Sequence, residues 1–225
     1  MRETAAEFAI PVARWSSWPR SAAAQEKSPD VAFVDAQIRR RLSPLARMML
    51  HVAHACAGER RGLRLVFASQ HGELGYTVPL LRALAAGEPL SPNTFSLSVH
   101  NGAAGLFSIV RGDRSEATAL AAGDETLGQA LIEARAQLDA DPRPVLVVYG
   151  DGEFPEEYRP WSDGAPARAL ALLLERDAER TTTLGFDAPD EADRSSGSQA
   201  EAFATHLAGR SSGSWTGAQH TWSWH

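Results

Sequence analysis

The sequence has 225 residues, 44% hydrophobic content and a formal net charge of −6. A chain of this length buries roughly 70% of its unfolded surface, enough for one compact domain, and the acidic balance argues against a general nucleic-acid binder. No apolar run reaches the roughly 20 residues that span a bilayer, and the single cysteine, Cys56, allows no disulfide within the chain. We therefore expect a cytoplasmic protein without a membrane span.

The first half of the chain predicts an alternation of strands and helices. Strands are indicated by apolar side chains at every second position or by a short apolar run, and helices by apolar side chains at every third or fourth position. Cys56 lies on the apolar stripe of one such helix, so we interpret it as a small core residue and not as a nucleophile. The predicted elements, in chain order, are a strand at 8–15, a loop at 16–30, a helix at 44–57, a strand at 62–68 and a helix at 76–86.

The second half continues this alternation, which together predicts an α/β layer fold. Ser91 and Pro92 suit the N-cap and first turn of a helix that runs to Gly112. The wholly apolar run 144–150 predicts a strand covered on both faces. The other predicted elements are a strand at 117–122, a helix from there to about 138, a hairpin of two strands at 167–175 and 181–186, a polar linker at 187–198, a helix at 200–207 and a polar tail with three tryptophans.

The turn after the predicted strand at 117–122 is the segment best suited to chemistry. A nucleophile at the N-terminus of a helix gains from the helix dipole, which lowers the pKa of a thiol and stabilises an oxyanion. This turn carries Gly123, Asp124 and Glu125, with neither Cys nor Ser. Acidic residues at the start of a helix are most simply interpreted as capping residues.

Other chemical sites are not indicated by the sequence. His51 and His54 share one helix face, but no further metal-ligand pattern accompanies them, so we interpret them as solvated or edge residues. Ser69 lies two residues from His71, yet the elbow pattern of a hydrolase is missing. Neither glycine-rich phosphate-binding pattern occurs, and we therefore expect neither a metal nor a cofactor.

The order and spacing of several segments resemble the β-ketoacyl synthase family over about residues 60–187. This resemblance implies the N-terminal half of a thiolase-like fold, with a central mixed sheet covered by helices. We therefore expect a ketosynthase-like domain over 1–187, followed at 188–225 by a polar linker, a short helix and a tryptophan-containing tail. The matching segments are the Asn-x-x-Ala-Gly helix at 98–106 (SVHNGAAGL), the strand, nucleophile elbow and helix at 118–134, the core strand at 145–150 and the following strand at 168–178 (RALALLLERDA).

The resemblance also implies that this chain is not a working catalyst. It places the nucleophilic cysteine of the family at or next to Asp124, and an aspartate cannot form an acyl thioester. The catalytic histidines of the family belong to a second half that these 225 residues do not include. The chain is similar to chain length factors and to half-length synthase-like proteins of aryl-polyene and xanthomonadin-type pigment biosynthesis. We expect it to pair with a full-length ketosynthase, and to meet an acyl carrier protein through that complex.

In the family, the strand before the elbow pairs with its counterpart in the partner, and the Asn-x-x-Ala-Gly helix lines the acyl tunnel, where added bulk would limit chain length. A half-fold would also expose apolar surface for the partner. Two alternatives stay open, namely an independent acyl-transfer or decarboxylating enzyme that uses Asp124 or His71, and a homodimeric scaffold. The residues expected at the interface or tunnel are Thr94, Phe95, Ser98, Asn101, Phe107, Ala117, Thr118, Leu120 and Ala122.

Overall fold

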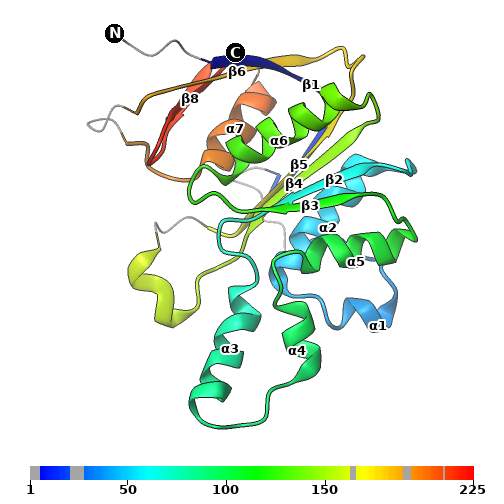
Figure 1. The fold of residues 1–225 in the computed structure, drawn as a ribbon, viewed down its shortest axis with the longest axis vertical. Helices are drawn as coiled ribbons and strands as arrows, with labels where there is room; N and C mark the ends of the chain where they lie inside the picture. The colour runs from blue at the N-terminus through cyan, green and yellow to red at the C-terminus, as the bar shows by residue number, and fades with distance from the viewer. Residues whose placement is uncertain (1–5, 21–27, 163–165, 190–193, 210) are drawn as a thin grey trace.

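The structure is a computed structural model that describes residues 6–20, 28–162, 166–189, 194–209 and 211–225. It contains an eight-stranded mixed sheet with helices on both faces (Figure 1). The strands are β1 (Ala6–Trp18), β2 (Arg64–Ala68), β3 (Ala117–Leu120), β4 (Val145–Asp151), β5 (Arg168–Leu174), β6 (Thr181–Asp187), β7 (Gly213–Thr216) and β8 (Thr221–Trp224). The helices are α1 (Ala36–Arg39), α2 (Pro44–Ala57), α3 (Leu74–Ala85), α4 (Pro92–Leu97), α5 (Gly102–Arg111), α6 (Thr126–Ala140), the 3-10 helix η1 (Glu156–Trp161) and α7 (Gln199–Gly209).

The strand order across the sheet is β3-β2-β4-β5-β1-β6-β8-β7. Strand β2 pairs in parallel with β3 and β4, whereas β5 pairs antiparallel with both β4 and β1. The predicted hairpin of β5 and β6 is wrong, because β1 lies between these two strands and pairs antiparallel with each. Strands β5 and β6 follow one another in the chain but are therefore separated in space by β1, the first of the described strands.

Side chains of each central strand alternate between two apolar cores. In β2, Leu65 and Phe67 pack into the core under α2 and α5, while Val66 and Ala68 pack into the core under α6 and α7. Strand β4 is buried over its first six residues, which confirms that both of its faces are covered. The predicted α/β class, with a mixed sheet between helical layers, is confirmed.

Helix α2 matches the predicted helix at both ends. The Ser43 hydroxyl accepts a hydrogen bond from the Ala46 amide, and Pro44 occupies the first turn, where a missing N–H costs nothing. Cys56 is fully buried, and its thiol donates to the Ala171 carbonyl at 3.3 Å. Its interpretation as a core residue is confirmed.

The helix predicted from Ser91 to Gly112 is two helices, α4 and α5, with residues 98–101 between them. Ser91 caps α4 through its hydroxyl, as predicted, and Gly112 ends α5 with a φ of 57°, a left-handed conformation that favours glycine. Helices α3 and α4 extend away from the sheet as an arm (Figure 1). Parts of the predicted loop and linker, residues 21–27 and 190–193, lie outside the described residues.

The last residues of the chain form strands that the sequence analysis did not predict. Strand β8 pairs antiparallel with β6, and β7 then pairs with β8, so the tail completes one end of the sheet. In β8, Trp222 and Trp224 are buried, and the residue between them, Ser223, is half-exposed. The tail is therefore part of the folded core.

Candidate functional site

The elbow between β3 and α6 is a tight turn closed by one threonine. Gly123 has a φ of 61°, in the left-handed region. The Thr126 hydroxyl donates to the Gly123 carbonyl at 2.6 Å and accepts from the Ala122 amide at 2.9 Å. This turn presents Asp124 and Glu125 at the N-terminus of α6, in the place that the resemblance assigns to a nucleophile.

Glu125 is the central residue of this site, and only 2% of it is exposed. One carboxylate oxygen accepts from the amides of Gln219 at 2.6 Å and His220 at 2.7 Å. The other oxygen accepts from the Trp222 indole at 3.1 Å and lies 2.6 Å from His220 Nδ1. Burial by itself would raise the pKa of Glu125, but the bonds from His220, Gln219 and Trp222 together lower it. The carboxylate is therefore an ionised anchor for the tail.

Asp124 also contacts the tail, since its carboxylate accepts from the Ala218 amide at 3.0 Å. Neither acid caps α6 in the usual way: Glu125 holds the N-cap position but makes no side-chain hydrogen bond to the helix. The interpretation of these residues as helix caps is therefore wrong, because their oxygens bind a segment more than ninety residues further along the chain.

The C-terminal segment covers the face of the sheet around α6. Trp215, Trp222 and Trp224 are all buried in the same core as α6 and α7. A Cβ atom on Gly128 of α6 would lie 2.6 Å from the Trp222 ring, so the helix and the indole touch. Helix α7 and strands β7 and β8 therefore cover this face of the sheet.

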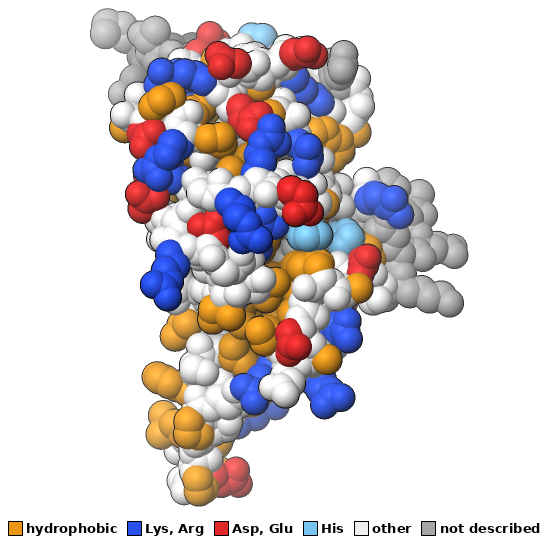
Figure 2. Space-filling view, turned by 90° about the vertical axis from the view of Figure 1, so that its right-hand side faces the viewer, with side chains coloured by type: hydrophobic (Ala, Val, Ile, Leu, Met, Phe, Trp, Pro, Cys, Tyr) orange, Lys and Arg blue, Asp and Glu red, His pale blue; other side chains and the backbone are white. Residues whose placement is uncertain are grey.

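Apart from Trp161 of η1, the exposed large apolar side chains of the described residues lie on α3, α4 and α5 and in the segments that connect them. Figure 2 shows hydrophobic side chains gathered at the narrow lower end of the molecule, where Figure 1 places the arm. Phe95 on α4 is 61% exposed, and Ile109 on α5 is 67% exposed. Exposed patches of this kind mark interaction sites. We call the following residues the arm patch: Leu81, Leu84, Leu90, Phe95, Val99 and Ile109.

The residues predicted to line a tunnel lie at different depths along α4 and α5. Thr94 and Ser98 are half-buried, and Asn101 is exposed just before α5. Phe107 is 2% exposed and packs against Phe67 of β2 with ring centroids 5.9 Å apart, so it belongs to the core. Phe95 is thus the large side chain of this set that reaches solvent.

The residues predicted for strand pairing lie on β3 and just beyond it. Strand β3 ends the sheet on one side, with β2 as its neighbour. Ala117 is exposed, whereas Thr118, Leu120 and Ala122 are half-buried. The structure therefore brings these four residues together along one open edge.

Asp124 and His71 line one hollow of about 290 Å³, together with aromatic side chains of Phe154, Trp161 and Trp215. The His71 ring lies edge-on to Phe154, with centroids 4.6 Å apart. The hollow lies beside the elbow, at the carboxyl ends of the parallel strands, the usual ligand position in open α/β sheets.

The cysteine and the helical histidines are structural. Burial raises the pKa of the Cys56 thiol to about 12, and the nearby Arg14 only partly offsets this. The His54 ring stacks on Phe33 with centroids 3.8 Å apart, and His51 lies edge-on to Trp18. Across the described ranges, no group of three or more His, Cys, Asp or Glu side chains is placed to hold a metal.

Sequence reasoning missed Glu125, His220 and Trp222 as a unit. Glu125 looks like a capping residue locally, and its partners lie 94 to 97 positions away. The alternation of Thr221, Trp222, Ser223 and Trp224 is a strand signal that would have indicated a buried tail.

The mixed sheet between helical layers, with its strand, elbow and buried helix, is that of the N-terminal half of a thiolase-like fold. The family model described as the β-ketoacyl synthase N-terminal domain matches residues 13–225. The chain therefore belongs to the family of β-ketoacyl synthase N-terminal domains. None of its described helices is long and apolar enough to cross a bilayer.

Solved structures resemble the chain over most of its length. One chain of the complex between the ketosynthase ApeO and its chain length factor ApeC from Xenorhabdus doucetiae is 26% identical, with a TM-score of 0.82. That alignment covers 96% of this chain and 99% of the other. No curated protein matches the sequence.

Two further structures share the fold at lower identity. The ishigamide ketosynthase/chain length factor is 18% identical with a TM-score of 0.58, over 82% of this chain and 68% of that one. A β-ketoacyl synthase from Burkholderia phymatum is 12% identical with a TM-score of 0.56, over 76% of this chain and 53% of that one.

Proposed function

We propose that this chain is a non-catalytic, chain-length-factor-like subunit that pairs with a complete β-ketoacyl synthase in polyketide or aryl-polyene biosynthesis. The likeness to one chain of the ApeO–ApeC complex, along 99% of that chain, supports this function. The elbow supports it as well, because Asp124 stands there in place of a nucleophile and is bonded to the tail.

The observation that carries the proposal is the open edge of β3. The amide of Leu65 in β2 donates to the Glu116 carbonyl at 2.9 Å, so Glu116 faces β2. Because alternate residues of a strand face opposite neighbours, the amides of Ala117 and Ala119 point to the open side. An unpaired edge of this kind is a template for a strand from another chain.

The arm patch lies on the helices next in the chain before β3, and it would extend the contact from a strand pair to an apolar surface. In this arrangement Phe95, with Thr94, Ser98 and Asn101 nearby, faces the acyl tunnel of the partner and limits chain length. Phe107 would contribute indirectly, because its contact with Phe67 of β2 holds α5 against the sheet.

The complex would meet the acyl carrier protein through the ketosynthase subunit. We place it in the cytoplasm, because a single buried cysteine suits a reducing compartment. In this proposal Glu125 and Asp124 hold the tail and take no part in acyl chemistry.

Co-expression with a full-length ketosynthase encoded beside this gene, followed by gel filtration, tests the proposal. The wild-type chain should co-elute with the synthase. Ala119→Pro removes the outward amide and should abolish co-elution while leaving the β2 ladder intact, since proline is tolerated on edge strands. Ala119→Ser retains the amide and should co-elute like wild type.

Other outcomes of these experiments would contradict the proposal or favour one of the two alternatives. A soluble monomer that never co-elutes contradicts the proposal, and so does an Ala119→Pro variant that co-elutes normally. A stable homodimer of the chain alone would favour a scaffold. Turnover of acyl carrier protein substrates by the isolated chain would favour an independent enzyme that uses Asp124 or His71.

A further inference from the structure

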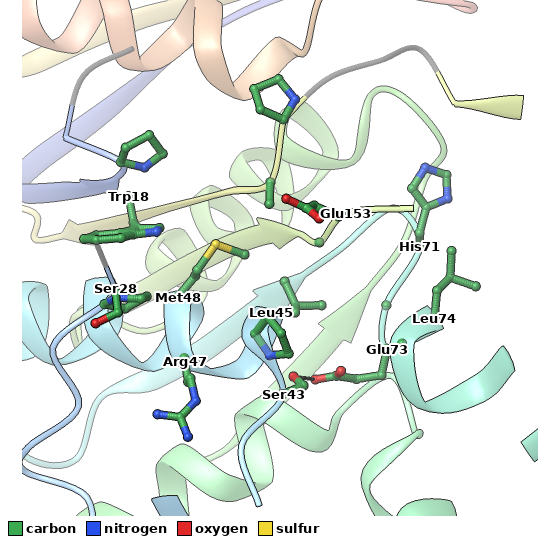
Figure 3. Close-up of a pocket in the computed structure, with 18 residues that line it drawn as sticks. Trp18, Ser28, Ser43, Leu45, Arg47, Met48, His71, Glu73, Leu74 and Glu153 are labelled. Carbon is green, nitrogen blue, oxygen red and sulfur yellow. Dashed lines mark hydrogen bonds between the residues drawn. The ribbon is translucent and has the colours of Figure 1, made fainter. Parts of the chain in front are cut away.

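A second hollow, of about 680 Å³, lies between the N-terminus of α2, the turn after β2 and the end of β1. Its volume is in the range of small-molecule sites, about 300–1,000 Å³. Figure 3 shows Trp18, Leu45, Met48 and Leu74 around it, which gives the hollow a mainly apolar wall. Asp124 does not line this hollow, but His71 lines both it and the hollow beside the elbow, so the two are neighbours.

One acidic side chain is built into this apolar wall. Glu73 is 7% exposed, and one of its oxygens accepts from the Ser43 hydroxyl at 2.8 Å (Figure 3). The same hydroxyl accepts from the Ala46 amide, so Ser43 is fixed by its role as the cap of α2. Helix α2 therefore holds the Glu73 carboxyl in place at the pocket.

Glu73 forms no ion pair with another described residue. Burial raises its pKa to about 7, and the Ser43 hydrogen bond only partly offsets this. The Arg47 guanidinium also lines the pocket, but it donates to the Arg39 carbonyl at 2.6 Å. The exposed Glu153 adds a second negative charge at the rim.

A ligand with an ammonium group would supply the missing positive partner of Glu73. Its apolar body would cover Trp18, Met48 and Leu74, because an apolar pocket with a few placed polar groups orients an amphipathic ligand. Above about pH 7, where Glu73 is ionised, an anionic ligand would meet the repulsion of Glu73 and Glu153. We infer that this pocket binds a small primary amine with an apolar or aromatic body.

Titration calorimetry with phenethylamine and with 2-phenylethanol, its uncharged counterpart, tests this inference. At pH 8 the amine should bind about tenfold more tightly than the alcohol, the effect of one charge-assisted hydrogen bond. Glu73→Gln should remove that difference and leave alcohol binding unchanged. Glu153→Gln, which neutralises the exposed rim acid, should change amine affinity by no more than about twofold.

The pH dependence of the wild-type chain is a second measurement that needs no variant. Ionisation of Glu73 should raise amine affinity about tenfold between pH 6 and 8, and alcohol affinity should stay constant. Three other titratable or charged groups line the pocket, namely Arg47, His71 and Glu153, and Tyr76 interacts electrostatically with Glu73.

Equal affinity for amine and alcohol, or an amine affinity that Glu73→Gln leaves intact, would overturn the inference. Because the site is separate from β3 and the arm patch, either result leaves the co-elution test of the subunit unaffected.

Discussion

The indole nitrogen of Trp222 donates to the Glu125 carboxylate at 3.1 Å, across 97 positions of the chain. Both residues are buried, and the charge lies at the N-terminus of α6, where the helix dipole favours an anion. This bond joins the elbow to β8, which is the last described strand along the chain. Several expected outcomes depend on that link.

Glu125→Ala should destabilise the chain by on the order of 3 kcal/mol, because the buried Trp222 indole and the partly buried amides of Gln219 and His220 lose their acceptor. Urea unfolding followed by tryptophan fluorescence measures this. Glu133→Ala, on the same helix but half-exposed, should cost less than about 1 kcal/mol. Equal losses in the two variants would show that the tail is not anchored through Glu125.

Gly128→Ala should cost about 1–3 kcal/mol, because the added methyl would lie 2.6 Å from the Trp222 ring. Gly105→Ala is the matched control, since Gly105 is also inside a helix but has nothing within 4 Å of the added atom. There the better helix propensity of alanine should add about 0.5–1 kcal/mol. Thermal unfolding of both variants compares the two, and a stabilised Gly128→Ala chain would contradict the contact.

Stability should fall as the pH rises from about 4.5 to 7, through the titration of Glu73. Burial raises its pKa from 4.5 to about 7, so the native state holds a proton that the unfolded chain releases in this window. This contribution to the free energy of unfolding is on the order of 3 kcal/mol. It is fully present below pH 4.5 and is lost above pH 7. Urea unfolding at several pH values measures it.

The Glu73→Gln variant supplies the comparison for that slope. In this variant the free energy of unfolding should differ little between pH 5 and pH 8. Glu153→Gln, at an exposed carboxylate, should keep the wild-type dependence of unfolding on pH. A Glu73→Gln chain with an unchanged profile would assign the slope to other groups.

Phe95→Ala should shift the products of the co-expressed complex toward longer chains. This prediction rests on the proposed function, in which the exposed Phe95 ring limits the tunnel. A misfit group costs about 1–3 kcal/mol, enough to change the ratio of stopping to extending by about tenfold. Mass spectrometry of the products measures the distribution, and Ser96→Ala, at an exposed neighbour, should leave it unchanged.

Local patterns predicted most of the central strands and helices, but not the strands of the tail and not all of the strand pairings. The helix from Pro44 to Ala57 was predicted at both ends, because its serine cap and apolar stripe are adjacent in sequence. The pairing of β1 between β5 and β6 was not, since it depends on contacts between distant segments. The family resemblance and the fold class are confirmed.

The turn between a strand and a helix was predicted at the right place, whereas the interpretation of its acids as helix caps was wrong. The elbow lies where the resemblance placed it, with Asp124 at the start of α6. Its occupation by the tail could not be derived from a local pattern, because the amides that bind Asp124 and Glu125 belong to residues 218–220. The strand that carries Trp222 and Trp224 does have a local signal, the alternation of polar and aromatic residues at 221–224.

The place of β1 in the sheet also governs how the chain folds during synthesis. β1 leaves the ribosome first, yet both of its neighbours, β5 and β6, lie beyond Arg168. At about 5–20 residues per second, the nascent chain carries this strand unpaired for roughly ten to thirty seconds. Pairing so distant in sequence is slow and open to aggregation. Chaperones that cover an unpaired strand during this interval should therefore raise the yield of folded protein.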